Sequence, residues 1–235
     1  MSDGKRAAQT QEKPARPAGP RERLLEAAVH VFGRYGFDGA STRMLADAAG
    51  VNLQAIPYYF GGKEGLYIAV AEHIGTLISA HIAGLRETVR GRLEEADREG
   101  PPIQKTEAQA LLTSILQTMA ALFVSDESEP WARFLIREQM EPTEAFQRVY
   151  GGVMRPMLEV AGRLVAILLD EDPAANNVKL RTFGLLGGVM AFRVARAAVL
   201  AQLGWAGFGE VETRQVQRLA ADLVASLNKE SRHDA

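Results

Sequence analysis

Residues 41–60 read STRMLADAAGVNLQAIPYYF. Ser41 is of the type that caps the first turn of a helix, and a short helix is expected over residues 42–48. A small residue, Ala46, falls where this helix would touch the next one, and Gly50 falls in the turn between them. The positions that would face inward are apolar: Leu45, Ala49, Val51 and Ile56. Two short helices joined by so tight a turn form a helix-turn-helix.

Apolar residues at helical spacing continue on both sides of this pair. Upstream, they predict a helix over residues 21–36, and Gly36 is placed to close it. Downstream, a third short helix is expected over residues 53–59, ending at the glycine pair 61–62. A long helical pattern then covers residues 63–93.

The rest of the chain also predicts helices alone, without the alternation of strands. Proline-containing breaks separate them, and Pro142 disfavours the α region for Glu141. The expected helices cover residues 105–124, 131–140, 142–169, 176–203 and 210–228. The fold class is therefore all-α, with about nine helices.

Composition divides the chain into three parts. Residues 1–20 hold three prolines and no large aliphatic side chain beyond Met1, so a disordered arm is expected there. Residues 21–80 form the helix-turn-helix unit, with the motif at about 42–60. Residues 81–235 form a larger helical unit.

Composition also limits the class of protein. The chain has 235 residues, 47% hydrophobic content and no cysteine, which indicates a real core without disulfides. The longest uninterrupted apolar run, residues 183–192, ends at Arg193 and is too short to span a membrane. The basic N-terminal residues are not followed by the apolar segment of a secretory signal. We expect a cytoplasmic protein with no membrane partner.

The sequence gives little indication that the protein is an enzyme. The sequence lacks a G-x-S-x-G elbow, a phosphate-binding G-x-x-x-x-G-K-[ST] loop and a cysteine nucleophile. His73 and His81 lie eight residues apart with no third ligand near them in sequence. No catalytic residue, metal site or cofactor is expected.

Two sets of residues resemble a known family. Residues 41–51 and 56–66, STRMLADAAGV and IPYYFGGKEGL, resemble the signature of TetR-family regulators, and the resemblance extends over residues 21–75. Several C-terminal segments resemble the CecR-type branch: Arg137-Glu138-Gln139, Pro142-Thr143, Ala191-Phe192-Arg193, and Gly204-Trp205 with Phe208. The resemblance implies a homodimeric transcriptional repressor that binds an inverted-repeat operator in double-stranded DNA and is released by a small organic effector.

The same resemblance implies which side chains read the bases. The N-terminal end of the second helix of the motif enters the major groove, carrying Asn52, Leu53, Gln54 and Ala55. Gln54 can pair with adenine, and Leu53 and Ala55 can meet thymine methyl groups. Asn52 either joins them or caps the helix.

Other residues of the motif suit the DNA backbone. Thr42 and Arg43 can grip phosphate at the start of the preceding helix, or Arg43 can reach a guanine. A hydroxyl from Tyr58 or Tyr59 and the charge of Lys63 can add phosphate contacts. Alternatively, Tyr59 belongs to the core and Lys63 is only a solvated lysine.

Pro57 departs from the family pattern, which usually has an aromatic side chain there that reaches the DNA backbone. Proline removes that side chain and a helical N–H. The end of the reading helix is therefore expected to be tightened or bent.

Small residues share one face of the helix expected over residues 176–203: Gly184, Gly188, Ala191, Ala195 and Ala198. Such a strip lets another helix approach closely, and with the last helix it would form half of a four-helix dimer interface. The alternative is tight packing inside one subunit.

A group of apolar side chains between the two ends suits an effector pocket: Met119, Phe123, Trp131 and Phe134, with Arg137 near them. The alternative is plain core, with Arg137 and Glu138 paired to neighbours such as Arg193.

The resemblance also implies a mechanism, in which the effector shifts the helix over residues 63–93 and changes the separation of the two reading helices. Two rivals remain. One is a regulator controlled by a protein partner without a small ligand. The other is an all-α ligand-binding or catalytic protein with a vestigial helix-turn-helix.

Overall fold

The computed structural model describes residues 19–98 and 100–230, and the expected N-terminal arm lies almost wholly outside them. The described residues are all-α, as the sequence predicts. The first four helices are α1 (Pro20–Gly39), α2 (Thr42–Ala49), α3 (Ala55–Phe60) and α4 (Lys63–Asp97). The others are α5 (Lys105–Val124), α6 (Glu129–Met140), α7 (Glu144–Val149), α8 (Arg155–Leu169), α9 (Asn176–Val194), α10 (Arg196–Leu203) and α11 (Glu210–Glu230), with a π-helical segment (Tyr150–Met154) before α8.

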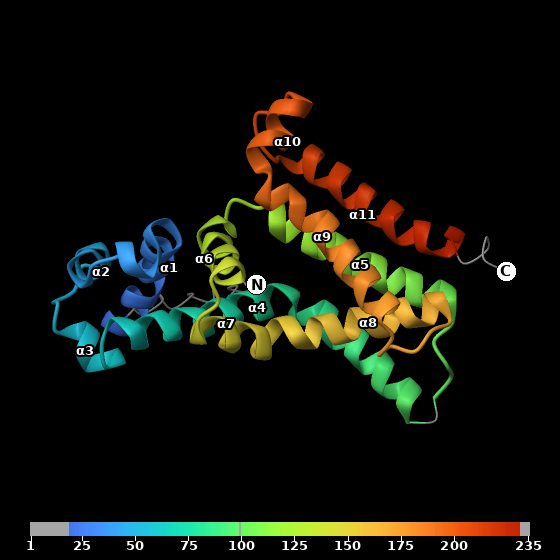
Figure 1. Ribbon diagram of the computed structural model, residues 1–235, viewed down its shortest axis with the longest axis horizontal. Helices are drawn as coiled ribbons and strands as arrows, with labels where there is room; N and C mark the ends of the chain where they lie inside the picture. Colours follow the sequence, from blue (N-terminus) through green and yellow to red (C-terminus); the bar gives the residue numbers. More distant parts are fainter. Residues whose placement is uncertain (1–18, 99, 231–235) are drawn as a thin grey trace, which may run out of the picture.

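The helices form two lobes joined by α4 (Figure 1). In the smaller lobe, α1, α2 and α3 enclose fully buried side chains at helical spacing: Leu24, Ala28, Phe32, Leu45, Ile56 and Leu66. In the larger lobe, α5 packs against α8, α9 and α11. Helix α6 packs against α1 of the smaller lobe, and α10 projects from the end of α9. The boundary expected between residues 80 and 81 falls inside α4.

Two of the nine expected helices are divided in the structure. The helix expected over residues 142–169 is broken by the π-helical segment, which lies just before Pro156 and contains Gly151 and Gly152. Proline cannot donate the helical hydrogen bond, so the ladder is rearranged ahead of it. The helix expected over residues 176–203 bends by 77° at Ala195.

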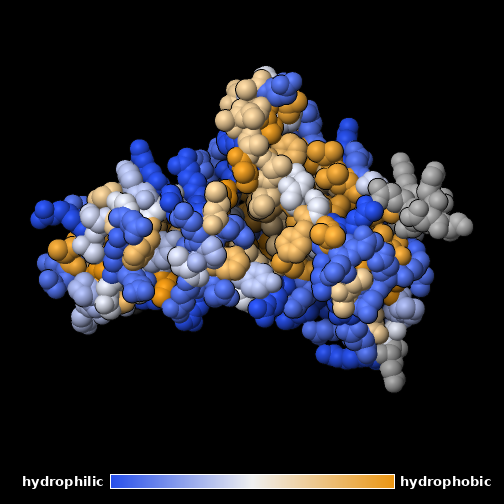
Figure 2. Space-filling model, in the orientation of Figure 1, coloured by the Kyte–Doolittle hydropathy of each residue, from blue (hydrophilic) through white to orange (hydrophobic). Residues whose placement is uncertain are grey.

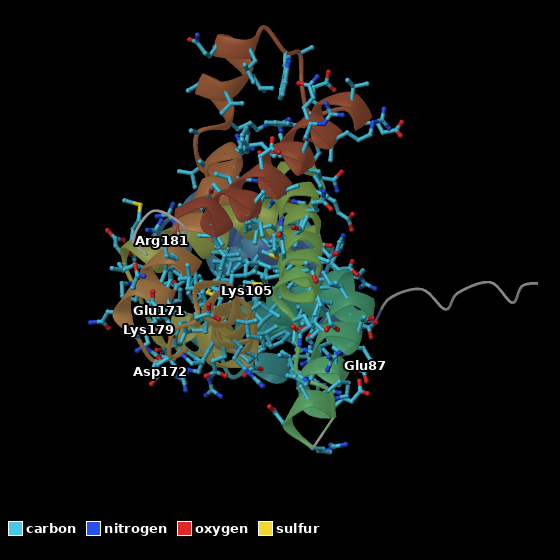
Figure 3. All side chains as sticks on the ribbon, turned by 90° about the vertical axis from the view of Figure 1, so that its right-hand side faces the viewer. Glu87, Lys105, Glu171, Asp172, Lys179 and Arg181 are labelled. Atoms are coloured by element: carbon cyan, nitrogen blue, oxygen red, sulfur yellow. The ribbon has the colours of Figure 1, made fainter. Side chains whose placement is uncertain are left out.

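Ion pairs close the far end of the larger lobe. Lys105, which opens α5, pairs with Asp170, which ends α8 in a left-handed conformation. Asn177 Nδ2 donates to Glu171 Oε1 at 2.7 Å, which ties the start of α9 to the same corner. Figure 3 looks onto this end, with Lys105, Glu171 and Asp172 among the labelled residues.

Two helices, α4 and α5, have the length and mean hydropathy of a membrane span, and the bent pair α9 and α10 would make a third. These helical stretches of 18 residues are apolar on average but can include up to two charged residues. The sequence expectation considered only uninterrupted apolar runs. In this fold, Leu112, Leu116 and Ala120 of α5 are buried. The apolar character of α5 therefore supplies the core of the larger lobe.

Candidate functional sites

The turn between α2 and α3 has the local chemistry that the sequence predicts. Ser41 Oγ accepts from the backbone N of Met44 at 3.1 Å and caps α2. Gly50 ends α2 at φ 60° and ψ 41°, a left-handed conformation that favours glycine. The N–H of Val51 then donates to the carbonyl of Ala46 at 3.0 Å. These bonds hold the start of α3 at a defined angle to α2.

The structure answers the question left open for Asn52. Its Oδ1 accepts from the backbone N of Gln54 at 2.9 Å, so Asn52 caps the turn that leads into α3. Helix α3 begins at Ala55 rather than at Leu53 as expected. Leu53 and Gln54 therefore lie in the capped turn, and both are exposed.

Pro57 does not bend α3, contrary to the expectation. It is the third residue of the helix, where a backbone N–H has no intrahelical partner to lose. The N–H of Tyr58 donates to the carbonyl of Gln54 at 3.1 Å, and the N–H of Gly61 donates to the carbonyl of Pro57 at 3.0 Å. The short helix is regular through the proline.

Seven of the nine residues predicted to contact DNA are exposed, and Ala55 and Lys63 are half-buried. Thr42 and Arg43 are exposed at the start of α2, and Tyr58 is 80% exposed on α3. A shallow hollow beside them is lined by Arg23, Gly50, Asn52, Gln54, Ala55, Pro57, Tyr58 and Tyr59. The Lys63 side chain contacts an aromatic ring of its own chain, since its Nζ lies 4.3 Å from the centroid of the Phe37 ring. We give the name reading surface to five of these exposed residues: Thr42, Arg43, Leu53, Gln54 and Tyr58.

Aromatic rings join the smaller lobe to α6. The Tyr67 ring of α4 lies 4.9 Å from the Phe32 ring and 4.7 Å from the Phe134 ring, centroid to centroid. The Tyr67 hydroxyl donates to Glu138 Oε1 at 2.6 Å. Burial, and then the Glu138 carboxylate, raise the pKa of Tyr67 well above its ordinary value, so the hydroxyl keeps its proton and stays a donor.

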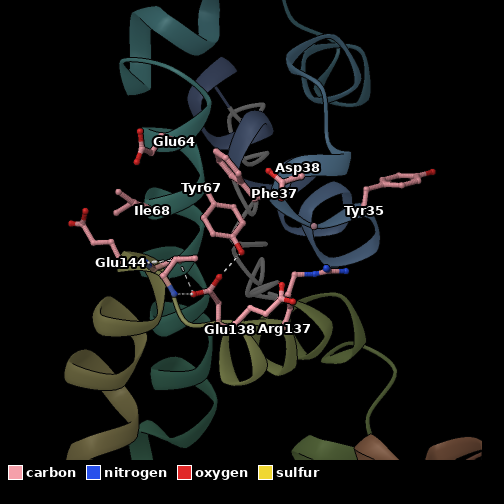
Figure 4. A pocket seen from close by; sticks show the side chains of 13 residues that line it. Tyr35, Phe37, Asp38, Glu64, Tyr67, Ile68, Arg137, Glu138 and Glu144 are labelled. Atoms are coloured by element: carbon pink, nitrogen blue, oxygen red, sulfur yellow. Dashed lines mark hydrogen bonds between the residues drawn. The ribbon is translucent and has the colours of Figure 1, made fainter.

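A hollow of about 240 Å³ lies at this junction, between α1, α4, α6 and α7 (Figure 4). On its wall, Gly36 interrupts α1 with φ 71° and ψ −177°, a conformation nearly confined to glycine. The Arg137 guanidinium lies directly against Gly36, since a Cβ there would be 2.8 Å from Arg137 Cζ. Arg137, predicted in a ligand pocket, thus contacts the kink of α1.

A second cavity, of about 230 Å³, lies deeper in the larger lobe, where α4, α5 and α8 meet the π-helical segment. Met119 lines it, as one of the predicted pocket residues. Most of its other walls are apolar: Ile82, Leu85, Val89, Ile115, Val153, Pro156, Met157 and Val160. Arg86, Arg90 and Thr118 also line it. We call this space the aliphatic cavity. Besides Met119, the helical spacing of the apolar α4 residues 82, 85 and 89 is the signal that the sequence offers for it.

The other predicted pocket residues lie elsewhere. Trp131 and Phe134 are buried on α6, and Phe123 is half-buried on α5. Phe134 packs on Tyr67, as described above. Their assignment to an effector pocket stays a prediction.

Arg193 does not pair with Arg137 or Glu138, the pairing considered from sequence. Its Nη2 donates to Ser128 Oγ at 2.7 Å and to the carbonyl of Ser125, because the end of α9 lies against the loop before α6. Burial lowers the pKa of the guanidinium. Arg193 therefore anchors the N-terminal end of α6.

The small residues predicted at the dimer interface do not form one continuous strip. Gly184 and Ala191 are exposed on α9, but a Cβ on Gly188 would lie 3.2 Å from Leu223 of α11 in the same chain. Ala195 and Ala198 are exposed but lie at and beyond the bend. The bend therefore divides the predicted strip.

Large apolar side chains are exposed on α9 beside these small ones: Leu180, Phe183, Met190 and Val194. With Gly184, Gly187 and Ala191 they repeat at helical spacing along one side, which we call the α9 face. Figure 2 shows apolar side chains gathered along α9 and α10.

Metal-binding geometry is not found in the described part of the chain, where no three His, Cys, Asp or Glu residues form a group. His73 is half-buried, and burial lowers its pKa. His81 Nε2 lies 3.7 Å from Glu127 Oε2 at the surface.

A capped helix-turn-helix on a helical body defines the chain as a DNA-binding regulator of transcription, not an enzyme. Residues 24–70 match the family described as bacterial regulatory proteins, tetR family, and residues 108–229 match the HTH-type transcriptional dual regulator CecR, C-terminal domain. The HTH-type transcriptional dual regulator CecR of Shigella flexneri is 33% identical over 200 residues, covering 84% of this chain and 86% of the relative. The chain belongs to the TetR family, and its C-terminal domain is of the CecR type.

Solved structures share the fold. A TetR-like regulator from Rhodococcus sp. RHA1 aligns with a TM-score of 0.60 at 18% identity, over 88% of this chain and 93% of that one. AibR in complex with isovaleryl coenzyme A and operator DNA aligns with a TM-score of 0.59 at 14% identity, over 86% and 96% of the two chains.

Proposed function

We propose that the chain is a homodimeric repressor that binds an inverted-repeat operator and releases it when a small organic effector binds. Residues 21–80 would read the DNA, and residues 81–235 would dimerise and bind the effector, in the cytoplasm at the nucleoid. The observation that carries the proposal is the presence, in one subunit, of the exposed reading surface and the exposed α9 face. A surface that reads a few base pairs gains specificity by pairing with a second copy.

The α9 face supports the dimer. A Cβ added at Gly184 or Gly187 would meet nothing within 4 Å, so packing inside the subunit does not require glycine at either position. Close approach of a second helix does require it, and α11 lies beside α9 to complete half of a four-helix interface. An isologous interface would bring the same face of each subunit together.

The aliphatic cavity supports the proposal that a small organic effector binds the larger lobe. Its walls favour a mainly apolar organic molecule. It touches α4, the helix that begins three residues after α3 ends, so a ligand there can act on the position of the reading helix. AibR shows that this fold can hold an organic ligand and operator DNA together.

The first test concerns base reading by Gln54. Gln54→Ala is expected to relax the preference at one position in each half-site, because a bidentate amide contact is worth about 1–3 kcal/mol of discrimination. Tyr58→Phe is expected to weaken all sequences alike, since it removes a hydroxyl placed for phosphate. Selection from random duplexes measures both, with Gln147→Ala on α7 as the matched control. An unchanged consensus for Gln54→Ala would remove Gln54 from the reading role.

The second test concerns the aliphatic cavity. The fluorescent probe anilinonaphthalene sulfonate is expected to bind the wild-type dimer saturably, and Met119→Trp should reduce this binding at least tenfold by filling the space. Operator affinity should stay within about twofold. Ala80→Trp, on the exposed side of α4, is the control for adding an indole. Equal probe binding by Met119→Trp and the wild type would place the effector site elsewhere.

Two measurements on the wild-type protein distinguish the proposed function from the two alternatives, a vestigial helix-turn-helix and control by a protein partner. Retardation of genomic fragments should show DNA binding, whereas a vestigial helix-turn-helix would bind none of them specifically. A shift in melting temperature with small molecules should show an effector, whereas control by a protein partner predicts no shift.

A further inference from the structure

One buried carboxylate connects the two lobes. Glu138 is in the last turn of α6 and is only 1% exposed. Its Oε1 accepts from the Tyr67 hydroxyl of α4 at 2.6 Å. Its Oε2 accepts from the backbone N of Thr143 at 3.1 Å and from Thr143 Oγ1 at 2.9 Å. These bonds are drawn in Figure 4, where Glu138 lies between α4 and the turn into α7.

We propose that Glu138 is a positioning residue that sets the angle of α4, and through it the place of the reading helix on DNA. Tyr67 is one turn into α4, which starts at Lys63 directly after α3. Thr143 caps α7, since its Oγ1 accepts from the backbone N of Ala145 at 3.1 Å. The carboxylate thus fixes α4 to the α6–α7 corner. This inference rests on the proposed operator binding.

The other end of α6 is also held by a hydrogen bond, which extends the connection from Glu138 to α9. There Arg193 of α9 donates to Ser128 Oγ, and Ser128 directly precedes α6. Helix α6 is therefore held at one end by the helix of the α9 face and at the other by α4. Between these two hydrogen bonds, α6 buries Trp131, Ala132 and Phe134, so it links α9 to α4 through packed side chains.

The chemistry requires a carboxylate at residue 138. All three partners donate, and a carboxylate offers two oxygens that only accept. In Glu138→Gln, the amide oxygen can still accept from Thr143, whereas the NH₂ group then turned toward Tyr67 can only donate to the hydroxyl oxygen and leaves the hydroxyl proton without its acceptor. A buried group left without its partner is costly, so the shape is kept while the connection is lost.

The test uses Tyr67→Phe, Glu138→Gln and the double variant, with the tightest duplex selected by the wild-type protein. Each single variant should bind this duplex about tenfold more weakly, because a less constrained α4 must be ordered on binding. The double variant should bind about as weakly as Glu138→Gln alone, since both changes break the same bond. The dependence of affinity on salt should not change, because no phosphate contact is removed.

Stability must be separated from positioning. Affinities are measured well below each melting temperature and corrected to the fraction of protein active in DNA binding. Glu141→Gln is the matched control, an exposed glutamate lining the same junction hollow, and should bind like the wild type. Wild-type affinity in Tyr67→Phe, or single effects that multiply in the double variant, would overturn the inference. Failure of the wild-type protein to bind any duplex would instead reject the proposed function, and the inference with it.

Discussion

Phe183→Glu on α9 is expected to produce a monomer that binds the operator at least a hundredfold more weakly than the wild type. Phe183 is 59% exposed in the single subunit and belongs to the α9 face. In an isologous dimer, the two copies of this face meet, so each subunit would bury a new carboxylate in the interface. Linked half-site binding typically adds a factor of about 10²–10⁴, and the monomer loses it.

Sedimentation at micromolar concentration measures the association, and titration of the selected duplex measures the affinity. Met140→Glu is the matched control, since Met140 is 79% exposed on α6 and lies outside the α9 face. It should remain dimeric and bind normally. Because Phe183 packs little within its own subunit, helical circular dichroism should be unchanged in Phe183→Glu. A variant that stays dimeric would show that another surface holds the subunits together.

The helix-turn-helix could be predicted in detail because its determinants are local. The Ser41 cap and the left-handed Gly50 act within a few residues of their own positions. Asn52 shows the limit of this reasoning. An asparagine at a helix start suits either capping or base reading, and only the bond to the backbone of Gln54 separates them.

The bend at Ala195 has no local signal, since neither proline nor glycine stands there. Contacts distant in sequence accompany it. Arg193, before the bend, donates to Ser128, and Arg196, after it, pairs with Asp126 at 3.0 Å. Both arginines therefore bind the loop between α5 and α6. Helical periodicity alone predicts the straight helix.

The residues that line the aliphatic cavity could not be identified from the sequence for a related reason. The aliphatic cavity lies where three helices distant in sequence meet, and its walls are of the same residue types as the core. The aromatic residues that suggested a pocket, Trp131 and Phe134, are buried on α6, at the contact between the lobes, and do not line the aliphatic cavity. Composition indicates that a side chain is apolar, but not whether space remains beside it.

Phe134→Ala is accordingly expected to act as a core substitution and to lower the free energy of unfolding by about 3–5 kcal/mol. Phe134 is 0% exposed, and its ring packs on that of Tyr67. Removing it leaves a cavity between α6 and α4 that neighbouring side chains fill only in part. Such a loss is a large fraction of the roughly 5–15 kcal/mol typical of whole proteins.

Denaturant unfolding at equal protein concentrations measures the loss, because the stability of the proposed dimer would depend on concentration. Tyr35→Ala, an exposed aromatic on α1, should cost less than about 1 kcal/mol and serves as the control. Binding of anilinonaphthalene sulfonate per folded dimer should not change in Phe134→Ala, because Phe134 does not line the aliphatic cavity. The opposite pattern, weaker probe binding at wild-type stability, would assign Phe134 to the effector pocket and contradict its role in the core.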